Sequence, residues 1–300
     1  PSIGIATYPE SGLSPSELLK NADLAMYHAK KSGRNEVHFF HEGLQNKAIQ
    51  YEEMRHKLKL ALAKNELYMV YQTIVDQDNT IIGWEALSRW QRLDGHTSMP
   101  NEFINIAEKS NQIVELGRWV ITKVLSEFTS LKGQFKTNDS PFISINISGY
   151  QLRDNELLQF LVNECQQNQI KPQQVLLELT ESTLLNKRSG HAELLRRLAA
   201  KGFAIAVDDF GTGYASYRHL RELPISVLKI DRCFIAGVDH IEESAAFTKS
   251  LLTLAKGLSI RVIAEGVETE EEAAFLREHD CSQMQGYLFH RPTRLNGQGT

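Results

Sequence analysis

The residues with the clearest chemical potential are Asp208 and Asp209, two adjacent carboxylates that directly follow the apolar run Phe203–Val207. That run has the length and β-branching of a buried strand, and a second such run, Val227–Ile230, contains Lys229. Burying ionised carboxylates is costly unless cations or several hydrogen-bond donors compensate. The stretch therefore predicts a metal site at the end of a sheet, although Asp, Gly and Thr are also ordinary turn residues.

Polar residues recur where the other predicted strands end. The pattern predicts eight strands separated by helices, over 68–75, 81–87, 142–147, 175–179, 203–207, 227–230, 261–264 and 284–288. These are the dimensions of a βα-barrel, in which the carboxyl ends of the strands converge on one mouth. The polar residues at these ends are Glu85, Arg89, Asn146, Glu178, Glu181, Asp208, Asp209, Lys229, Asp231, Glu265, Glu268 and Gln285. Each alone could be a cap, a turn residue or a surface ion pair, but their joint recurrence predicts one site.

The chemistry of this set favours hard cations. It is rich in carboxylate and amide oxygens and contains no histidine or cysteine, which selects Mg²⁺ or Mn²⁺ over zinc. Several carboxylates can hold two cations about 4 Å apart, the arrangement used for phosphodiester cleavage. We expect Asp208 to bridge the cations, Lys229 to lie near the attacking water or the developing anion, and Arg89 to suit a substrate phosphate. A salt bridge from Lys229 to Asp208 or Asp231 is an alternative that does not exclude the first.

The order of elements predicts an α/β fold, a TIM-like (βα)8 barrel preceded by a small α+β fragment. The first two barrel strands are joined by a short turn, so we expect one strand to run antiparallel. Residues 1–40 are predicted to form a strand, a helix and a strand, which bury too little surface to fold alone. Residues 41–52 are predicted to be a linker, and residues 53–300 the barrel. Because the chain starts at Pro1 within a strand-like segment, we expect it to be a fragment of a longer protein.

Composition excludes several classes of protein. The 300 residues are 42% hydrophobic with a formal net charge of −4, which argues for a globular protein that does not bind polymeric nucleic acid. The three cysteines, Cys165, Cys233 and Cys281, fit no metal or redox spacing and favour a reducing compartment. No apolar run approaches the ~18 residues that span a bilayer. We expect a cytoplasmic location without membrane contact, while segments outside this sequence could anchor the full protein to the inner membrane.

Seven stretches, in order over about Arg55–Pro292, resemble the EAL domain family of cyclic di-GMP phosphodiesterases. They are EALSRW from Glu85, NIS from Asn146, ELTES from Glu178, DDFGTGY from Asp208, KIDRCFI from Lys229, AEGVET from Ala264 and QGYLFHRP from Gln285. Two stretches nearer the start, SIGIA and ADLAMYHAKKSGRN, resemble the C-terminal end of the GGDEF (diguanylate cyclase-like) family. The GGDEF signature itself is absent from the sequence, so no cyclase activity follows.

The resemblance implies hydrolysis of cyclic di-GMP to linear pGpG with two Mg²⁺ or Mn²⁺ ions, and inhibition by Ca²⁺. The implied metal ligands are Glu85, Asn146, Glu178, Asp208, Asp209 and Glu265, with Glu85 and Asp209 also counted as catalytic. Lys229 and Gln285 would align the attacking water, and Glu268 would brace the loop Phe210–Ser216. That loop and adjacent helices would also form a homodimer. The implied substrate contacts are Gln72, Leu87, Arg89, Asp231 and Gln285.

The chain departs from the family pattern at three places. Thr73 and Asn105 each stand where proline is more usual, and Gly149–Tyr150 stands where alanine and a polar residue are more usual. None of these positions carries a metal-binding side chain. Hydrolysis is therefore favoured over a receptor that binds cyclic di-GMP without turnover. A different metal-dependent barrel enzyme, which stabilises an enolate with Mg²⁺ and a lysine base, is permitted by the acids and Lys229 but opposed by the ordered motifs.

Overall fold

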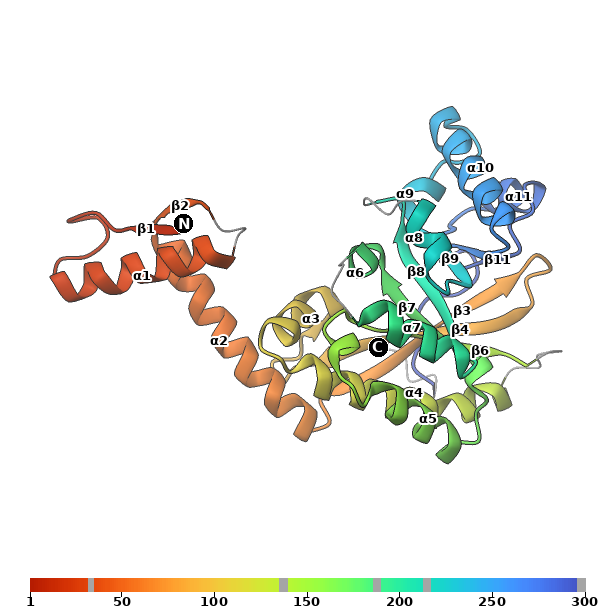
Figure 1. Cartoon of the computed structure of the whole chain (residues 1–300), viewed down its shortest axis with the longest axis horizontal. Coiled ribbons are helices and arrows are strands. Elements are labelled where there is room, and N and C mark those ends of the chain that lie inside the picture. Colours follow the sequence, from red (N-terminus) through yellow and green to blue (C-terminus); the bar gives the residue numbers. More distant parts are fainter. Residues whose placement is uncertain (32–34, 135–139, 186–189, 213–216, 296–300) are drawn as a thin grey trace. The chain divides into compact units, whose positions relative to one another are not determined.

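The computed structural model describes residues 1–31, 35–134, 140–185, 190–212 and 217–295. The chain divides into two compact units, Pro1–Ala63 and Lys64–Thr300, whose elements are labelled in Figure 1. No helix among the described residues is both long enough and apolar enough to cross a membrane.

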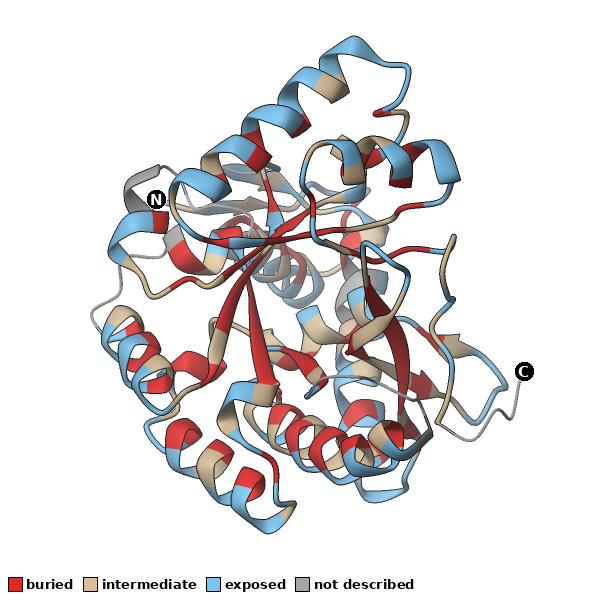
Figure 2. Ribbon diagram, turned by 90° about the vertical axis from the view of Figure 1, so that its right-hand side faces the viewer, coloured by how far each residue is buried: buried red, intermediate tan, exposed pale blue. Residues whose placement is uncertain are grey.

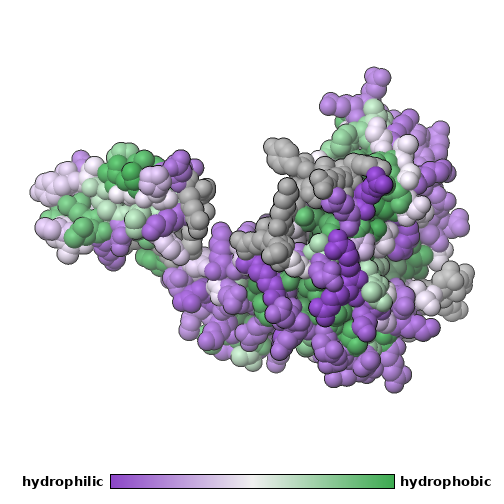
Figure 3. Space-filling model, viewed as in Figure 1, coloured by the Kyte–Doolittle hydropathy of each residue, from purple (hydrophilic) through white to green (hydrophobic). Residues whose placement is uncertain are grey.

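The first unit is a strand–helix–strand motif followed by a long helix, and the predicted α+β fragment is thereby confirmed. Its elements are β1 (Ile3–Ile5), α1 (Pro15–Lys31), β2 (Val37–Phe39) and α2 (Glu42–Ala63). The two strands pair in parallel. A Cβ atom at Gly4 would lie 2.1 Å from the backbone of Ala22, so α1 packs directly on β1 where position 4 has no side chain. Figure 3 shows apolar patches on the surface of this unit. Val37 and Phe39 of β2 are among its exposed apolar residues.

The segment expected to be a linker, residues 41–52, is helical, because α2 begins at Glu42. The apolar residues Leu58 and Ala61 of this helix are fully buried. The sequence over 42–57 is polar and charged, and it carries no clear signal for where a linker would end and the helix begin. The predicted domain boundaries otherwise stay predictions.

Eight strands of the second unit close into the predicted barrel. Their order is β3-β11-β10-β9-β8-β7-β6-β4, and β4 pairs back with β3 to close the ring. The strands are β3 (Leu67–Asp76), β4 (Ile81–Gln91), β6 (Phe142–Asn146), β7 (Val175–Thr180), β8 (Ala204–Phe210), β9 (Val227–Ile230), β10 (Arg261–Ala264) and β11 (Gln283–Met284). β3 pairs antiparallel with both neighbours, as expected, and the remaining barrel pairs are parallel.

Helices surround the barrel and bury one side against it. Figure 2 shows buried strands at the centre, and helices that carry buried residues on one side and exposed residues on the other. These helices are α3 (Pro100–Lys109), α4 (Ile113–Gln134), α5 (Leu157–Gln167), α6 (Glu181–Leu185), α7 (His191–Ala200), α8 (Tyr217–Glu222), α9 (Arg232–Ile235), α10 (Glu242–Gly257) and α11 (Glu270–Glu278). Such one-sided burial supplies most of the stability of surface helices.

Four short features differ from the sequence expectation. Strand β5 (Thr97–Ser98) extends the hairpin of β4 beyond the barrel, and the short helices α6 and α9 directly follow strands. The last strand ends at Met284 rather than Leu288. It stops because the chain turns at Gly286, where an added Cβ would lie only 1.9 Å from the carbonyl oxygen of Val267.

Candidate active site

The site centres on Lys229, which β9 carries at the mouth of the barrel with its side chain only 1% exposed. Its Nζ atom lies 2.6 Å from Glu265 Oε1 and 2.9 Å from Glu178 Oε1. It also lies 3.3 Å from Asp208 Oδ1 and 3.6 Å from Glu85 Oε2. Carboxylates from four different strands or their ends therefore meet around one ammonium group, and the predicted salt bridge to Asp208 is confirmed.

Amide side chains hold Glu85 in this cluster. Asn146 Nδ2 donates to Glu85 Oε1 at 3.1 Å, and Gln285 Nε2 donates to Glu85 Oε2 at 2.6 Å. Gln285 Nε2 also donates to Gln72 Oε1 at 3.1 Å. Gln285 directly follows β11, and its backbone N–H donates to the carbonyl of Ala264 in β10. This hydrogen bond places the Gln285 side chain next to the cluster. Both oxygens of the Glu85 carboxylate are thus oriented from neighbouring strand ends.

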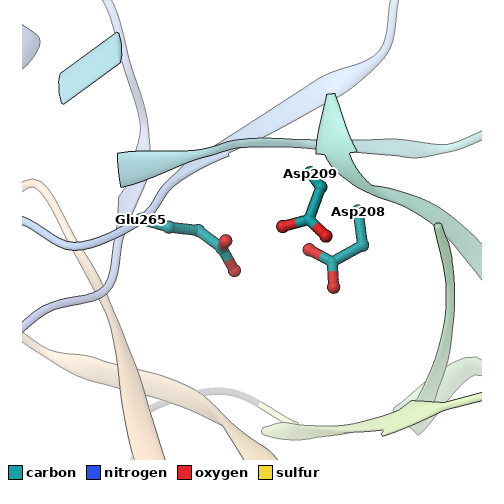
Figure 4. Close-up of side chains that lie close together, drawn as sticks. All are labelled: Asp208, Asp209 and Glu265. Carbon is teal, nitrogen blue, oxygen red and sulfur yellow. The ribbon is translucent and has the colours of Figure 1, made fainter. Parts of the chain in front are cut away.

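A β-bulge brings both aspartates to the same side. In a regular strand, successive side chains point to opposite faces. The register of β8 against β9 shifts between Val207 and Phe210, and Asp209 has a φ of 54° in the left-handed region. One carboxylate oxygen from each of Asp208, Asp209 and Glu265 lies within 4.8 Å of the other two, and the three carboxylates converge in Figure 4. Bulges of this kind are common next to active sites.

Burial and mutual repulsion shape the ionisation of the cluster. Burial raises the pKa of Glu178 well above its usual range and that of Glu265 to about 8, against the attraction of Lys229. Burial also raises the pKa of Asp209, and the charge of Asp208 adds to the effect. In Glu85 the effect of burial is outweighed by Lys229, Gln285 and Asn146, which lower its pKa.

Lys229 stays protonated in this environment. Burial alone would lower the pKa of a lysine. Here the surrounding carboxylates outweigh burial, and the pKa of Lys229 lies well above its usual value. With every group ionised, the cluster holds five carboxylates, the four around Lys229 and Asp209, and one ammonium, which leaves four negative charges uncompensated.

The predicted substrate contacts of β4 lie on the same strand face as Glu85. Side chains two residues apart share a face, which places Leu87 and Arg89 in line with Glu85 along β4. Gln72 is paired with Glu85 across the β3–β4 ladder. Burial lowers the pKa of the half-buried Arg89, with Tyr68, Tyr287 and Glu85 acting in the opposite direction.

Two predicted site residues make other contacts. Asp231 caps α9, where its Oδ1 accepts from the N–H of Cys233 at 2.8 Å. Glu268 pairs with Arg232 at 2.9 Å. Residues 213–216 of the loop that Glu268 was expected to brace lie outside the described residues, so that role stays a prediction.

Glu181 makes a contact with the described start of this loop. Glu181 is only 3% exposed, and its Oε2 accepts from the N–H of Gly211 at 3.0 Å. The sequence placed Glu181 among the strand-end acids but gave it no role. The signal in the sequence was its position three residues after Glu178. There α6 begins, and the Glu181 side chain reaches Gly211 at the end of β8.

Comparisons with known proteins identify two family models. The model described as the EAL domain matches residues 55–292, and that described as the diguanylate cyclase, GGDEF domain, matches residues 1–36.

Curated relatives share about a third of the aligned residues. The bifunctional diguanylate cyclase/cyclic di-GMP phosphodiesterase MucR of Pseudomonas aeruginosa is 37% identical over 293 residues, 97% of this chain and 42% of the relative. The cyclic di-GMP phosphodiesterase NbdA of the same species is 35% identical, over 98% of this chain and 37% of the relative. The cyclic di-GMP phosphodiesterase PdeR of Escherichia coli is 32% identical, over 97% and 44%. The chain thus spans less than half the length of each.

Solved structures of phosphodiesterase and EAL proteins also superpose on this chain. The PaMucR phosphodiesterase in complex with c-di-GMP superposes with a TM-score of 0.75 at 34% identity, over 81% of this chain and 98% of the other. An EAL enzyme with cAMP and cyclic-di-GMP bound gives a TM-score of 0.80 at 31% identity, over 93% and 73%.

Proposed function

The chain belongs to the EAL domain family, and we propose that its barrel hydrolyses cyclic di-GMP to linear pGpG with two bound divalent cations. The observation that carries the proposal is the meeting of Glu85, Glu178, Asp208 and Glu265 within 3.6 Å of Lys229 Nζ. Relatives named as cyclic di-GMP phosphodiesterases are 32–37% identical in sequence to this chain. Their activity supports the same reaction for this chain.

The donor set fits Mg²⁺ or Mn²⁺. The candidate ligands are Glu85, Asn146, Glu178, Asp208, Asp209 and Glu265, which offer only oxygen as a metal ligand. Glu178 Oε2 is buried and has no hydrogen-bond partner among the residues that the structure describes. A buried acceptor without a donor is costly, and a cation would satisfy it. Two divalent cations would also balance the four uncompensated negative charges.

Bound divalent cations supply a hydroxide nucleophile at neutral pH and offset negative charge on the leaving oxygen. The chain itself orients the groups around the reacting phosphate. Asn146 and Gln285 fix the Glu85 carboxylate from two sides. Lys229 is enclosed by carboxylates, so its first contribution is to keep them close together despite their repulsion.

Gln285 has an acceptor available for the attacking water. Both N–H groups of its amide are used by Gln72 and Glu85. Its Oε1 is buried and has no hydrogen-bond partner within the described part of the chain. A water that donates to this oxygen would be held next to Glu85, which is the role expected from the family resemblance.

The proposed reaction is a hydrolysis that opens the cyclic dinucleotide. The water oxygen bonds to one phosphorus, one phosphorus–oxygen ester bond breaks, and the released ribose oxygen takes up a proton. The second phosphodiester stays intact, which leaves linear pGpG with a terminal phosphate. The planar, permanently charged guanidinium of Arg89, on the same strand face as Glu85, suits a substrate phosphate. Leu87 and Asp231 remain proposed substrate contacts, and homodimerisation remains a prediction.

The test is hydrolysis of cyclic di-GMP with Mg²⁺ or Mn²⁺, followed by chromatography of the products, for the wild-type chain and Glu85→Ala. We expect pGpG from the wild type, none in EDTA, inhibition by Ca²⁺, and a loss of turnover of at least about 100-fold in the variant with much smaller loss of binding. Glu278→Ala, which removes an exposed carboxylate at the end of α11, is the matched control. Binding of cyclic di-GMP without product in the wild type would instead identify a receptor.

A further inference from the structure

A chain of hydrogen-bonded amides runs from the C-terminal segment His290–Thr293 to the acidic cluster. The carbonyl oxygen of His290 accepts from Gln72 Nε2 at 3.1 Å. Gln72 Oε1 accepts from Gln285 Nε2, which also donates to Glu85. The three residues Gln72, Gln285 and Glu85 are all buried, so water does not easily replace these partners.

The two ends of this chain fix its direction. A backbone carbonyl and a carboxylate only accept hydrogen bonds. Gln72 must therefore turn its NH₂ group to His290, which leaves its oxygen toward Gln285. Gln285 must then turn its NH₂ group to both Gln72 and Glu85, and its own oxygen is left over. If Gln72 flipped, its NH₂ group would face the NH₂ group of Gln285, and the arrangement would be lost.

Thr73 contacts the imidazole of His290, the residue whose carbonyl accepts from Gln72. Thr73 Oγ1 and His290 Nδ1 share a hydrogen bond of 2.9 Å, and Thr73 is only 5% exposed. Two further backbone hydrogen bonds join Tyr71 and Thr293, at 2.8 and 3.0 Å. The segment therefore lies along β3, and the pair Thr73–His290 ties the end of it that is next to Gln72.

We propose that Thr73 and His290 are positioning residues for hydrolysis, which act through Gln72 to orient the Gln285 amide. The proposal rests on the proposed function for its kinetic effect, but the orientation itself belongs to the metal-free protein. Neither residue reaches the acidic cluster directly. Loss of one neutral hydrogen bond is worth about 0.5–1.5 kcal/mol, so we expect turnover to fall roughly two- to tenfold while KM for cyclic di-GMP changes less than about twofold.

The test uses Thr73→Val, which keeps the shape and removes the hydroxyl, and His290→Ala, with Thr73→Ser to restore the hydroxyl. Matched controls are Thr253→Val on α10 and His240→Ala, whose side chain is 69% exposed. The structural readout is the side-chain amide signals of Gln72 and Gln285 in ¹⁵N-glutamine-labelled, metal-free protein, assigned with Gln72→Leu and Gln285→Leu. The kinetic readouts are kcat and KM.

We expect both amide signals to move in Thr73→Val and His290→Ala, to return in Thr73→Ser, and to stay in place in the controls. Turnover should follow the same pattern, and the double variant should lose no more than the worse single variant, because both remove one hydrogen bond. Unchanged amide signals in Thr73→Val and His290→Ala would overturn the proposal, whether or not the chain is active. A wild type without turnover would refute the proposed function alone. Fully additive losses in the double variant would also refute the shared role.

Discussion

Replacing Lys229 by methionine tests how the acidic cluster is held together without metal. The substitution removes an ammonium group that lies 2.6–3.6 Å from four carboxylates. Methionine is unbranched, flexible and apolar, so it fits a position that is fully buried and leaves little empty volume. The change therefore isolates the charge of the lysine.

The magnitude follows from opposing effects. Two unit charges about 3 Å apart attract by roughly 5 kcal/mol at an effective dielectric of about 20. Desolvation costs several kcal/mol for each ion, and loss of one partner of a buried pair costs about 3–5 kcal/mol in total. Glu178 and Glu265 have raised pKa values and can take up protons when the lysine is removed. We therefore expect the lower end, a loss of about 3 kcal/mol in the free energy of unfolding.

The assay is urea unfolding in EDTA and again with saturating Mn²⁺. Lys256→Met is the matched control, since that lysine and its partner Asp280 are more than 70% exposed, and it should cost less than about 1 kcal/mol. Saturating Mn²⁺ should return about 2–3 kcal/mol to Lys229→Met, because a ligand that binds the folded state stabilises it. A loss below about 1 kcal/mol in EDTA, or no stabilisation by Mn²⁺, would refute the reasoning.

Three further predictions concern the same fold. Burial raises the pKa of Glu265 from 4.5 to about 8, so at this group the folded chain binds more protons than the unfolded chain between about pH 4.5 and 8. Metal-free stability should therefore fall as pH rises through this window, and Mg²⁺ should abolish the fall in thermal unfolding at each pH. Gly286→Ala should cost more than about 2 kcal/mol in urea unfolding, since its Cβ would lie 1.9 Å from the carbonyl of Val267, whereas Gly257→Ala has no neighbour within 4 Å and should not destabilise. A urea unfolding midpoint of Gly286→Ala equal to that of the wild type would contradict this packing. Partial desolvation and the neighbouring Asp231 carboxylate raise the pKa of the Cys233 thiol to about 11, so mass spectrometry should show slow alkylation at pH 7.5 and a steep rise toward pH 10; a fast, pH-independent reaction would contradict it.

The barrel could be predicted from the sequence because its signals are local. Apolar runs such as Val227–Ile230 and Arg261–Ala264 became strands with the same bounds. The short turn after Asp76 was enough to predict the antiparallel strand. The end of β11 was not predictable, because it depends on the close approach of Gly286 to Val267, two residues that only the folded barrel brings together.

The acids of the site could also be predicted, since each lies on or directly after a strand of the barrel. Their arrangement could not. The bulge that turns Asp208 and Asp209 to the same side depends on the register against β9. The contact of Glu181 with Gly211 depends on the path of α6. The hydrogen bond between Thr73 and His290 joins residues 217 positions apart.

The position of Lys229 bears on how the acidic cluster is balanced before the proposed cations bind. Five buried carboxylates without a cation would repel one another and destabilise the folded state. A cluster with a matching number of lysines would be neutral and would gain little from Mg²⁺. One buried lysine lies between these limits: it neutralises one charge of five, and raised pKa values at Glu178 and Glu265 let protons replace part of the rest. Binding of divalent cations must then displace those protons, so their release on titration with Mn²⁺, measured by calorimetry in buffers of different ionisation enthalpy, follows directly from this geometry.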